Sequence, residues 1–221
     1  MTFGDNGVPV DQVLKGYTIE LDESGYQKTL QKGFVYDFLL PVKNPGAYQF
    51  RIAMRDENTE KIGSASQFIE VPDVNKKNLT LSSLILRNYS ITDWKKISAG
   101  QNNLEPQNGN IFLDTTSREF KRGTVLNYFY EIYNAKTDSL QNPHLQVQIK
   151  LFHDGKMILQ SNPAPLNVNS NNSQQTEISD AITLGTDLQA GDYVLQLIIS
   201  DNLATGKNQV ASQAIDFEVT E

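Results

Sequence analysis

The chain has 221 residues, a formal net charge of −7 and a pI near 4.9. An acidic surface repels phosphate backbones and anionic lipid headgroups, so we expect no nucleic-acid binding. The absence of cysteine excludes a disulfide framework, a thiol nucleophile and a cysteine-ligated zinc site, and no apolar run reaches the ~18 residues of a membrane span.

The first third of the chain predicts strands and one short helix. Asp5-Asn6-Gly7 favours a tight turn after an opening strand. Tyr17 to Leu21 alternates as a strand, Asp22 to Lys32 favours a short helix, and Phe34 to Leu40 alternates again. With the hairpin that follows, this gives about five strands, fewer than the ~7 of an immunoglobulin-like sandwich. We therefore expect the first domain to be incomplete at its N-terminus.

An internal repeat organises the chain. The segment PGAYQFRIAMRDENTEKIGSASQFIEV at Pro45 to Val71 is matched by AGDYVLQLIISDNLATGKNQVASQAIDFEV at Ala190 to Val219. Each copy has an alternating strand, a polar turn and a returning strand, which predicts a β-hairpin. Each also enters its first strand with Gly-x-Tyr, a step typical of the tyrosine corner of immunoglobulin-like sandwiches. We interpret Tyr48 and Tyr193 as structural corner residues.

The rest of the chain predicts a complete second sandwich. Asn88 to Asn110 is polar and aperiodic, which predicts a long loop. Alternating patterns on either side of it bring the count to about seven strands, as a sandwich needs. They begin near Leu79, Val125, Leu145, Lys156 and Thr176, before the second hairpin.

These patterns predict an all-β fold of two tandem immunoglobulin-like β-sandwich domains. Residues 1–72 form a partial domain, 73–78 a linker, and 79–221 the complete sandwich.

Few residues offer catalytic or metal chemistry. His144 and His153 lie near turns, and although His153 precedes Asp154, adjacent strand residues point to opposite faces. We interpret both histidines as turn and surface residues. We predict no catalytic, cofactor-binding or metal residue, no cofactor, and no enzymatic activity.

Carboxylates at loop ends are candidate calcium ligands, but none of these loops has the D-x-D-x-D run of an EF-hand. Asp56 and Asp201 occupy equivalent positions in the turns of the two hairpins. Aspartate side chains cap turns by accepting hydrogen bonds from backbone N–H groups. We predict this structural role for both.

Trp94 and Tyr89 are the candidate interaction surface, since exposed aromatic residues on a rigid scaffold bind proteins or carbohydrates. The alternative is that Trp94 folds back to fill a sandwich end or the domain junction. A carbohydrate-binding module would add an aromatic strand containing Tyr128, Phe129, Tyr130 and Tyr133.

Four stretches together resemble the C-terminal portion of the VWFA-related acidobacterial family. They are Pro45 to Asp73, Phe120 to Ala135, Leu151 to Gly155 and Gly191 to Asp201. In this family a von Willebrand factor A-type domain precedes immunoglobulin-like β-domains. The metal motif of the A-type domain, Asp-x-Ser-x-Ser, does not occur here, so no metal ligand is carried over. The resemblance implies a periplasmic, cell-surface or extracellular protein whose signal peptide lies outside these residues.

The leading hypothesis is a non-catalytic structural or interaction module, either a spacer or adhesion-associated. Its partner would be another protein or a neighbouring domain of the parent chain. The alternatives are a carbohydrate-binding module and the accessory domain of an exported enzyme. The incomplete first domain also predicts an open sheet edge through which the chain could self-associate.

Overall fold

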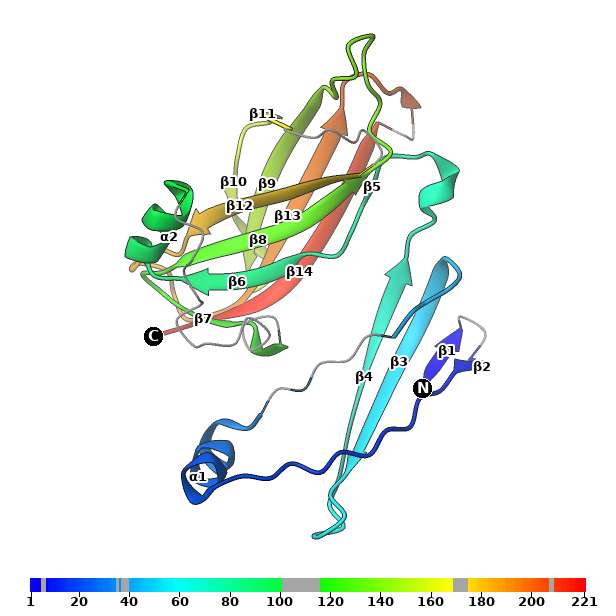
Figure 1. Cartoon of the computed structure of the whole chain (residues 1–221). Helices are drawn as coiled ribbons and strands as arrows, with labels where there is room; N and C mark the ends of the chain where they lie inside the picture. The colour runs from blue at the N-terminus through cyan, green and yellow to red at the C-terminus, as the bar shows by residue number, and fades with distance from the viewer. Residues whose placement is uncertain (5–6, 35, 37–39, 101–115, 169–174, 207–208) are drawn as a thin grey trace. The chain divides into compact units, whose positions relative to one another are not determined.

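The protein is all-β and divides into two units, Met1–Asp73 and Val74–Glu221 (Figure 1). The computed structural model describes the chain except residues 5–6, 35, 37–39, 101–115, 169–174 and 207–208. A 3₁₀ helix, η1 (Val74–Lys76), lies within the predicted linker. No helix in the described part of the chain is long and apolar enough to cross a membrane.

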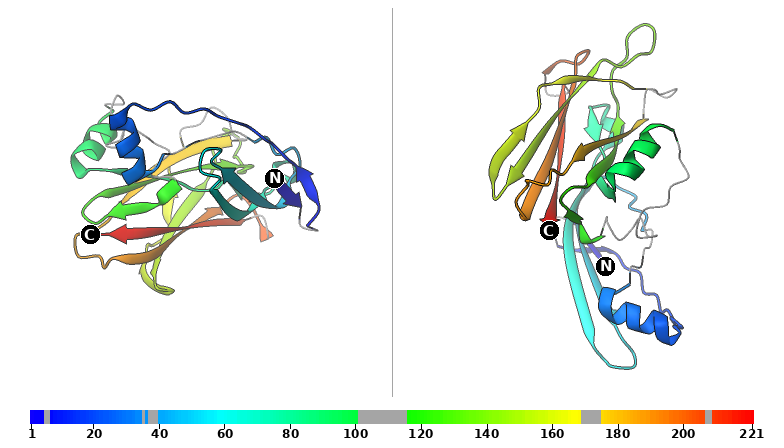
Figure 2. Two further views of the ribbon diagram at one scale, coloured as in Figure 1. Left: turned by 90° about the horizontal axis from the view of Figure 1, so that it is seen from below. Right: turned by 90° about the vertical axis from the view of Figure 1, so that its left-hand side faces the viewer.

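The second unit is an immunoglobulin-like sandwich of two sheets, seen as separate layers in Figure 2. The larger sheet has the order β10–β9–β13–β14–β7, and β11 also pairs with β9. We call it the front sheet, although it lies behind the other sheet in the view of Figure 1. The back sheet has the order β12–β8–β5, and β6 also pairs with β8. In sequence order, the strands of the front sheet are β7 (Glu119–Lys121), β9 (Leu145–His153), β10 (Lys156–Gln160), β11 (Ala164–Leu166), β13 (Gly191–Asp201) and β14 (Val210–Thr220). Those of the back sheet are β5 (Thr80–Leu81), β6 (Ile85–Tyr89), β8 (Val125–Tyr133) and β12 (Gln175–Thr183).

The core lies between β8 and β13 because the inward positions of both strands are occupied by apolar and aromatic residues. Leu197 and Ile199 of β13 are 0% exposed, and Tyr128 and Tyr130 of β8 are 1% exposed. Burial raises the pKa of both tyrosines above the ordinary value, so they stay neutral. Tyr128 and Tyr130 therefore belong to the core. Assigning them to a carbohydrate-binding face was wrong, because only the alternate residues of β8 point outward.

Both hairpins begin with a tyrosine corner. The Tyr193 hydroxyl donates a hydrogen bond to the Gln189 carbonyl at 2.7 Å, and the Tyr48 hydroxyl donates to the Asn44 carbonyl at 2.8 Å. Two residues before each tyrosine lies a glycine with a positive φ angle, 146° at Gly46 and 139° at Gly191, a region that favours glycine. The Gly-x-Tyr step thus sets both the backbone turn and the bond that fixes it.

The described part of the first unit contains a single sheet of order β2–β1–β3–β4. Its strands are β1 (Thr2–Gly4), β2 (Pro9–Asp11), β3 (Gly46–Arg55) and β4 (Ile62–Val71). Tyr48 is buried at one end of the apolar face, whereas Ile52 and Met54 at the other end are 42% and 63% exposed. No second sheet covers this face in the described part of the unit.

The helix predicted in the first unit is confirmed. Helix α1 spans Glu23–Lys32, and the Asp22 carboxylate caps it by accepting a hydrogen bond from the Gly25 N–H at 2.7 Å. Gly33 ends the helix with a φ of 70°. Local capping chemistry decides this element, so the sequence was sufficient to find it.

The strand predicted at Tyr17 to Leu21 is wrong, because these residues join no sheet. Of the strand predicted at Phe34 to Leu40, the described residues Phe34, Tyr36 and Leu40 also lie in no strand. Residues 35 and 37–39 lie outside the described part of the chain. An alternating pattern gives a segment one apolar face that a sheet could bury. A strand forms only where a neighbouring strand pairs with that segment.

The long loop predicted at Asn88 to Asn110 is wrong in its first half. Asn88 and Tyr89 belong to β6, and helix α2 spans Ile91–Ser98. The Ser90 hydroxyl oxygen accepts a hydrogen bond from the Asp93 N–H at 3.0 Å and donates one to the Asp93 carboxylate at 2.7 Å. Ser90-x-x-Asp93 is a capping-box pattern that would have signalled the helix. Residues 101–110 lie outside the described part of the chain.

The turn-capping role predicted for Asp56 and Asp201 is confirmed. Asp56 accepts from the Asn58 N–H and Asp201 from the Leu203 N–H, each at 2.9 Å. Asp201 is fully buried and also accepts from the Lys136 N–H at 2.8 Å. The second copy therefore joins its hairpin turn to the loop that follows β8, whereas the exposed Asp56 serves its own turn.

We expect Tyr193→Phe to lower the unfolding free energy of the second unit by about 1–2 kcal/mol, because the Gln189 carbonyl loses its donor. Urea denaturation monitored by circular dichroism measures the change in unfolding free energy. Tyr48→Phe is the matched control in the first unit and should leave this transition in place. An unchanged midpoint in Tyr193→Phe would contradict a stabilising corner bond.

We expect Asp201→Ala to destabilise the second unit by about 3 kcal/mol, because two buried backbone N–H groups lose their acceptor. Asp56→Ala removes the equivalent carboxylate from an exposed turn and should change the same transition little. Thermal and urea unfolding of the two variants provide the comparison. Equal losses of stability in the two variants would show that the burial of Asp201 does not increase its contribution to the unfolding free energy.

Candidate functional site

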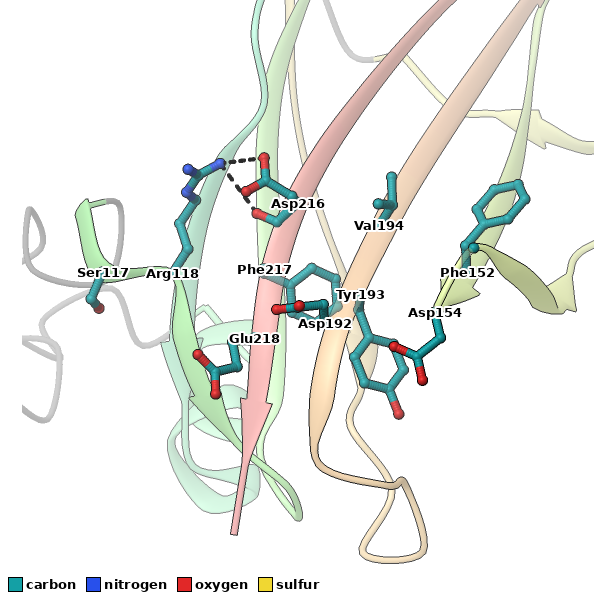
Figure 3. A pocket seen from close by; sticks show the side chains of 11 residues that line it. Ser117, Arg118, Phe152, Asp154, Asp192, Tyr193, Val194, Asp216, Phe217 and Glu218 are labelled. Atoms are coloured by element: carbon teal, nitrogen blue, oxygen red, sulfur yellow. Dashed lines mark hydrogen bonds and ion pairs between the residues drawn. The ribbon is translucent and has the colours of Figure 1, made fainter. Parts of the chain in front are cut away.

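A hollow of about 540 Å³ lies on the outer face of the front sheet, beside β7 (Figure 3). Period-two alternation points several of its side chains outward, because their strand neighbours belong to the core. Two of these core residues, Tyr193 and Phe217, also line the hollow. The outward side chains of β9, β13 and β14 in the hollow are Phe152, Asp192, Val194, Asp216 and Glu218.

An apolar row leads into this hollow. Met157 of β10 pairs with Phe152 of β9, and Phe152 pairs with Val194 of β13. Directly paired residues point to the same face, so the three side chains form a continuous line across three strands. Both Met157 and Val194 are exposed. We call Met157, Phe152 and Val194 the apolar row.

The row ends at an ion pair. Val194 pairs across the ladder with Asp216, whose carboxylate receives a hydrogen bond from Arg118 Nη1 at 2.7 Å. The same nitrogen donates to the Asp216 carbonyl at 3.2 Å, and the Arg118 carbonyl accepts from the Glu218 N–H at 2.8 Å. These bonds hold the guanidinium against β14, as Figure 3 shows.

The hollow is acidic in spite of Arg118. Four carboxylates and one guanidinium line it, and Asp192 lies directly opposite Glu218 in the β13–β14 ladder. Like charges that face each other across strands are destabilising. A cationic group placed between them would relieve this repulsion. The hollow therefore suits a ligand that combines apolar and basic side chains.

The two histidines are engaged locally. His144 Nε2 lies 2.9 Å from the Asp138 carboxylate in an exposed turn. The His153 side chain is only 15% exposed, so its interpretation as a surface residue was wrong. It pairs with Tyr193 and stacks on that ring with 4.5 Å between centroids. Its Nε2 lies 3.8 Å from the Asp154 carboxylate.

Tyr89 and Trp94 are brought together beside the back sheet. Tyr89 is 8% exposed, and the partly buried Trp94 of α2 packs against it with 5.8 Å between ring centroids. The exposed part of Trp94 is what a ligand would contact. The role of this pair as an interaction surface stays a prediction.

The hollow was not predicted from the sequence, although a signal was present. Phe152 interrupts the polar outward positions of β9, and Val194 is an apolar residue at an outward position of β13, as is Ile198. The register that aligns them with Met157 and Asp216 depends on strand pairing. Metal chemistry finds no support in the described residues, because no three His, Asp or Glu side chains are arranged to hold an ion.

No protein-family model matches the chain, and no curated protein matches its sequence. Among solved structures, the CARDB domain of a Pyrococcus furiosus protein in complex with di-metal ions is 8% identical, with a TM-score of 0.30; the match covers 65% of this chain and 94% of that domain. A family 123 glycoside hydrolase from Clostridium perfringens is 10% identical, with a TM-score of 0.30. The match covers 63% of this chain and 27% of the hydrolase chain. Scores of this size do not establish a shared fold, so the immunoglobulin-like assignment rests on the strand order.

We expect a pH-dependent opening of the Asp138 turn. Hydrogen bonds from the Asn142 N–H and His144 hold the Asp138 pKa below its ordinary value of 3.8. Because the folded pKa is the lower one, the stabilising contribution is complete above about pH 3.8 and is lost as pH falls through the folded pKa. NMR shifts of the Leu140 and Asn142 amides against pH measure the transition. Asp138→Asn should abolish it, and a midpoint above 3.8 would contradict the assignment.

Proposed function

We propose that the chain is a non-catalytic immunoglobulin-like interaction module of an exported bacterial protein. Its second unit binds a protein partner on the outer face of β9, β13 and β14. The observation that carries this proposal is the apolar row that runs across β10, β9 and β13 into the carboxylate-lined hollow. An exposed apolar line on a rigid sheet, bordered by charge, is the surface type that partners use.

The chemistry of the hollow specifies the partner. Phe152 and Val194 can pack against an apolar side chain of the partner. Asp192 and Glu218 can form ion pairs with a lysine or arginine. Successive side chains of an extended segment point to opposite faces, so a segment with apolar and basic residues at positions i and i+2 presents both kinds to the hollow. Arg118 limits the acidity at one end by neutralising Asp216.

The sandwich supports this face mechanically. The inward neighbours of the hollow residues belong to the buried core, so the strands that display Phe152, Val194 and Asp216 cannot shift independently. A preorganised surface loses little conformational entropy when it binds. This favours an interaction module over a passive spacer.

We expect a peptide in which leucine and lysine alternate at every second position, with serine between them, to shift the NMR resonances of Phe152 and Val194 selectively, because both residue types then lie on one face of the extended chain. The same peptide with glutamate in place of lysine should not, because the hollow is acidic. Phe152→Ser should weaken binding by about tenfold through lost apolar contact. Arg118→Ala should strengthen binding severalfold, since it frees the Asp216 carboxylate.

Gln196→Ala is the control, because it lies on the same outer face of β13 but outside the hollow. Equal binding of the two peptides, or shifts that map elsewhere, would overturn the assignment of this face. Circular dichroism of each variant establishes that the sandwich remains folded.

A further inference from the structure

Strand β10 forms one edge of the front sheet. It pairs with β9 on one side, and no strand in the described part of the chain pairs with its other side. All five of its residues are exposed. Met157, Ile158 and Leu159 are consecutive apolar residues that are 52%, 48% and 49% exposed. An exposed apolar edge strand is a template on which another strand can pair.

The backbone groups of β10 that face away from β9 can be identified. The Ser161 N–H donates to the Ile149 carbonyl at 2.9 Å, so the Ser161 backbone faces β9. Backbone direction alternates along a strand, so Gln160 faces the free edge. The register then shifts between Met157 and Leu159, a bulge that places two residues of β10 opposite one residue of β9. Met157 therefore faces the free edge again, with its N–H and its C=O.

Other edge strands of the same sandwich carry features that discourage pairing. β12 displays the carboxylates of Glu177 and Asp180, both exposed. β7 is three residues long and ends with Lys121, and β11 contains Pro165. Charge, short length and proline are common means of protecting a sheet edge. β10 has a single charged residue, Lys156 at its start, and its centre is apolar.

We propose that β10 pairs antiparallel with β10 of a second copy of the chain, about a twofold axis at Met157. In this register the Met157 N–H of each copy donates to the Met157 carbonyl of the other. Lys156 lies opposite Ile158 of the second copy, so no like charges face each other. Such a contact is isologous and occupies the free edge of both copies, so assembly stops at a dimer.

The apolar row favours a second copy as the occupant of this edge. The row runs from Val194 through Phe152 to Met157, which is the residue at the proposed axis. Directly paired residues point to the same face, so pairing Met157 with itself joins two rows into one line across both sheets. An unrelated strand could bond the same backbone groups but would continue the row only with an apolar residue at that one position.

The dimer is compatible with the docking face but does not depend on it. Strand pairing at the edge uses backbone groups of β10, whereas the outer face displays its side chains. The outer face of the front sheet therefore stays open in the dimer. The dimer presents two acidic hollows connected by one apolar line.

The first experiment uses the full chain without any peptide, so its result is independent of the partner proposed for the hollow. We expect sedimentation velocity to show a monomer–dimer equilibrium that shifts toward dimer as concentration rises. Amide hydrogen exchange at Met157 should slow in parallel, because its N–H becomes bonded. The Ser161 amide already bonds to Ile149 and should not change.

Charged substitutions at the axis test the register. Met157→Lys and Met157→Glu should each raise the dissociation constant of the dimer by about tenfold or more, because like charges then face each other. An equimolar mixture of the two variants should restore the dimer in a salt-dependent manner, because a lysine then faces a glutamate. Met54→Lys is the matched control, since Met54 is 63% exposed in the first unit and should not affect the dimer.

Several outcomes would overturn the proposal. A chain that stays monomeric at every concentration would leave this edge to another polypeptide. A dimer that persists in Met157→Lys, or that Met54→Lys dissociates, would place the contact outside β10. Failure of the mixed variants to associate would exclude pairing about Met157. Circular dichroism of each variant establishes that the sandwich remains folded.

Discussion

A β-sheet with one apolar face is stable only when a second layer covers that face, and this constraint governs both units. In the second unit the back sheet supplies the cover, and Leu197 and Ile199 of β13 lose all contact with solvent. In the first unit an equivalent hairpin with the same register leaves Ile52 and Met54 exposed. Local sequence forms the hairpin, and the surrounding strands decide whether its face is buried.

The same constraint explains why the two surfaces differ in kind. The second unit has a closed core, so what it offers a partner is the outer face of its front sheet, where Phe152, Val194 and the Arg118–Asp216 pair are held in register. In the first unit the apolar face itself is exposed at Ile52 and Met54, because no second sheet covers it in the described part of the unit.

The corner and turn residues show how a repeat diverges while its geometry is retained. Tyr48 and Tyr193 make the same hydroxyl-to-carbonyl bond, and Asp56 and Asp201 cap the same turn. Only Asp201 is buried, because the second unit brings the loop after β8 against it through the Lys136 N–H. A shared motif thus has a local role in one copy and a long-range role in the other.

The sequence by itself determined the elements that short-range chemistry controls. The two hairpins, the turn-capping aspartates and helix α1 follow from alternation, Gly-x-Tyr steps and capping residues, all within a few positions of one another. Tertiary structure decided what depends on a neighbour. Tyr17 to Leu21 alternates yet forms no strand, because no strand pairs with it. The hollow arises from the register between segments distant in sequence, and alternation within one segment carries no information about that register.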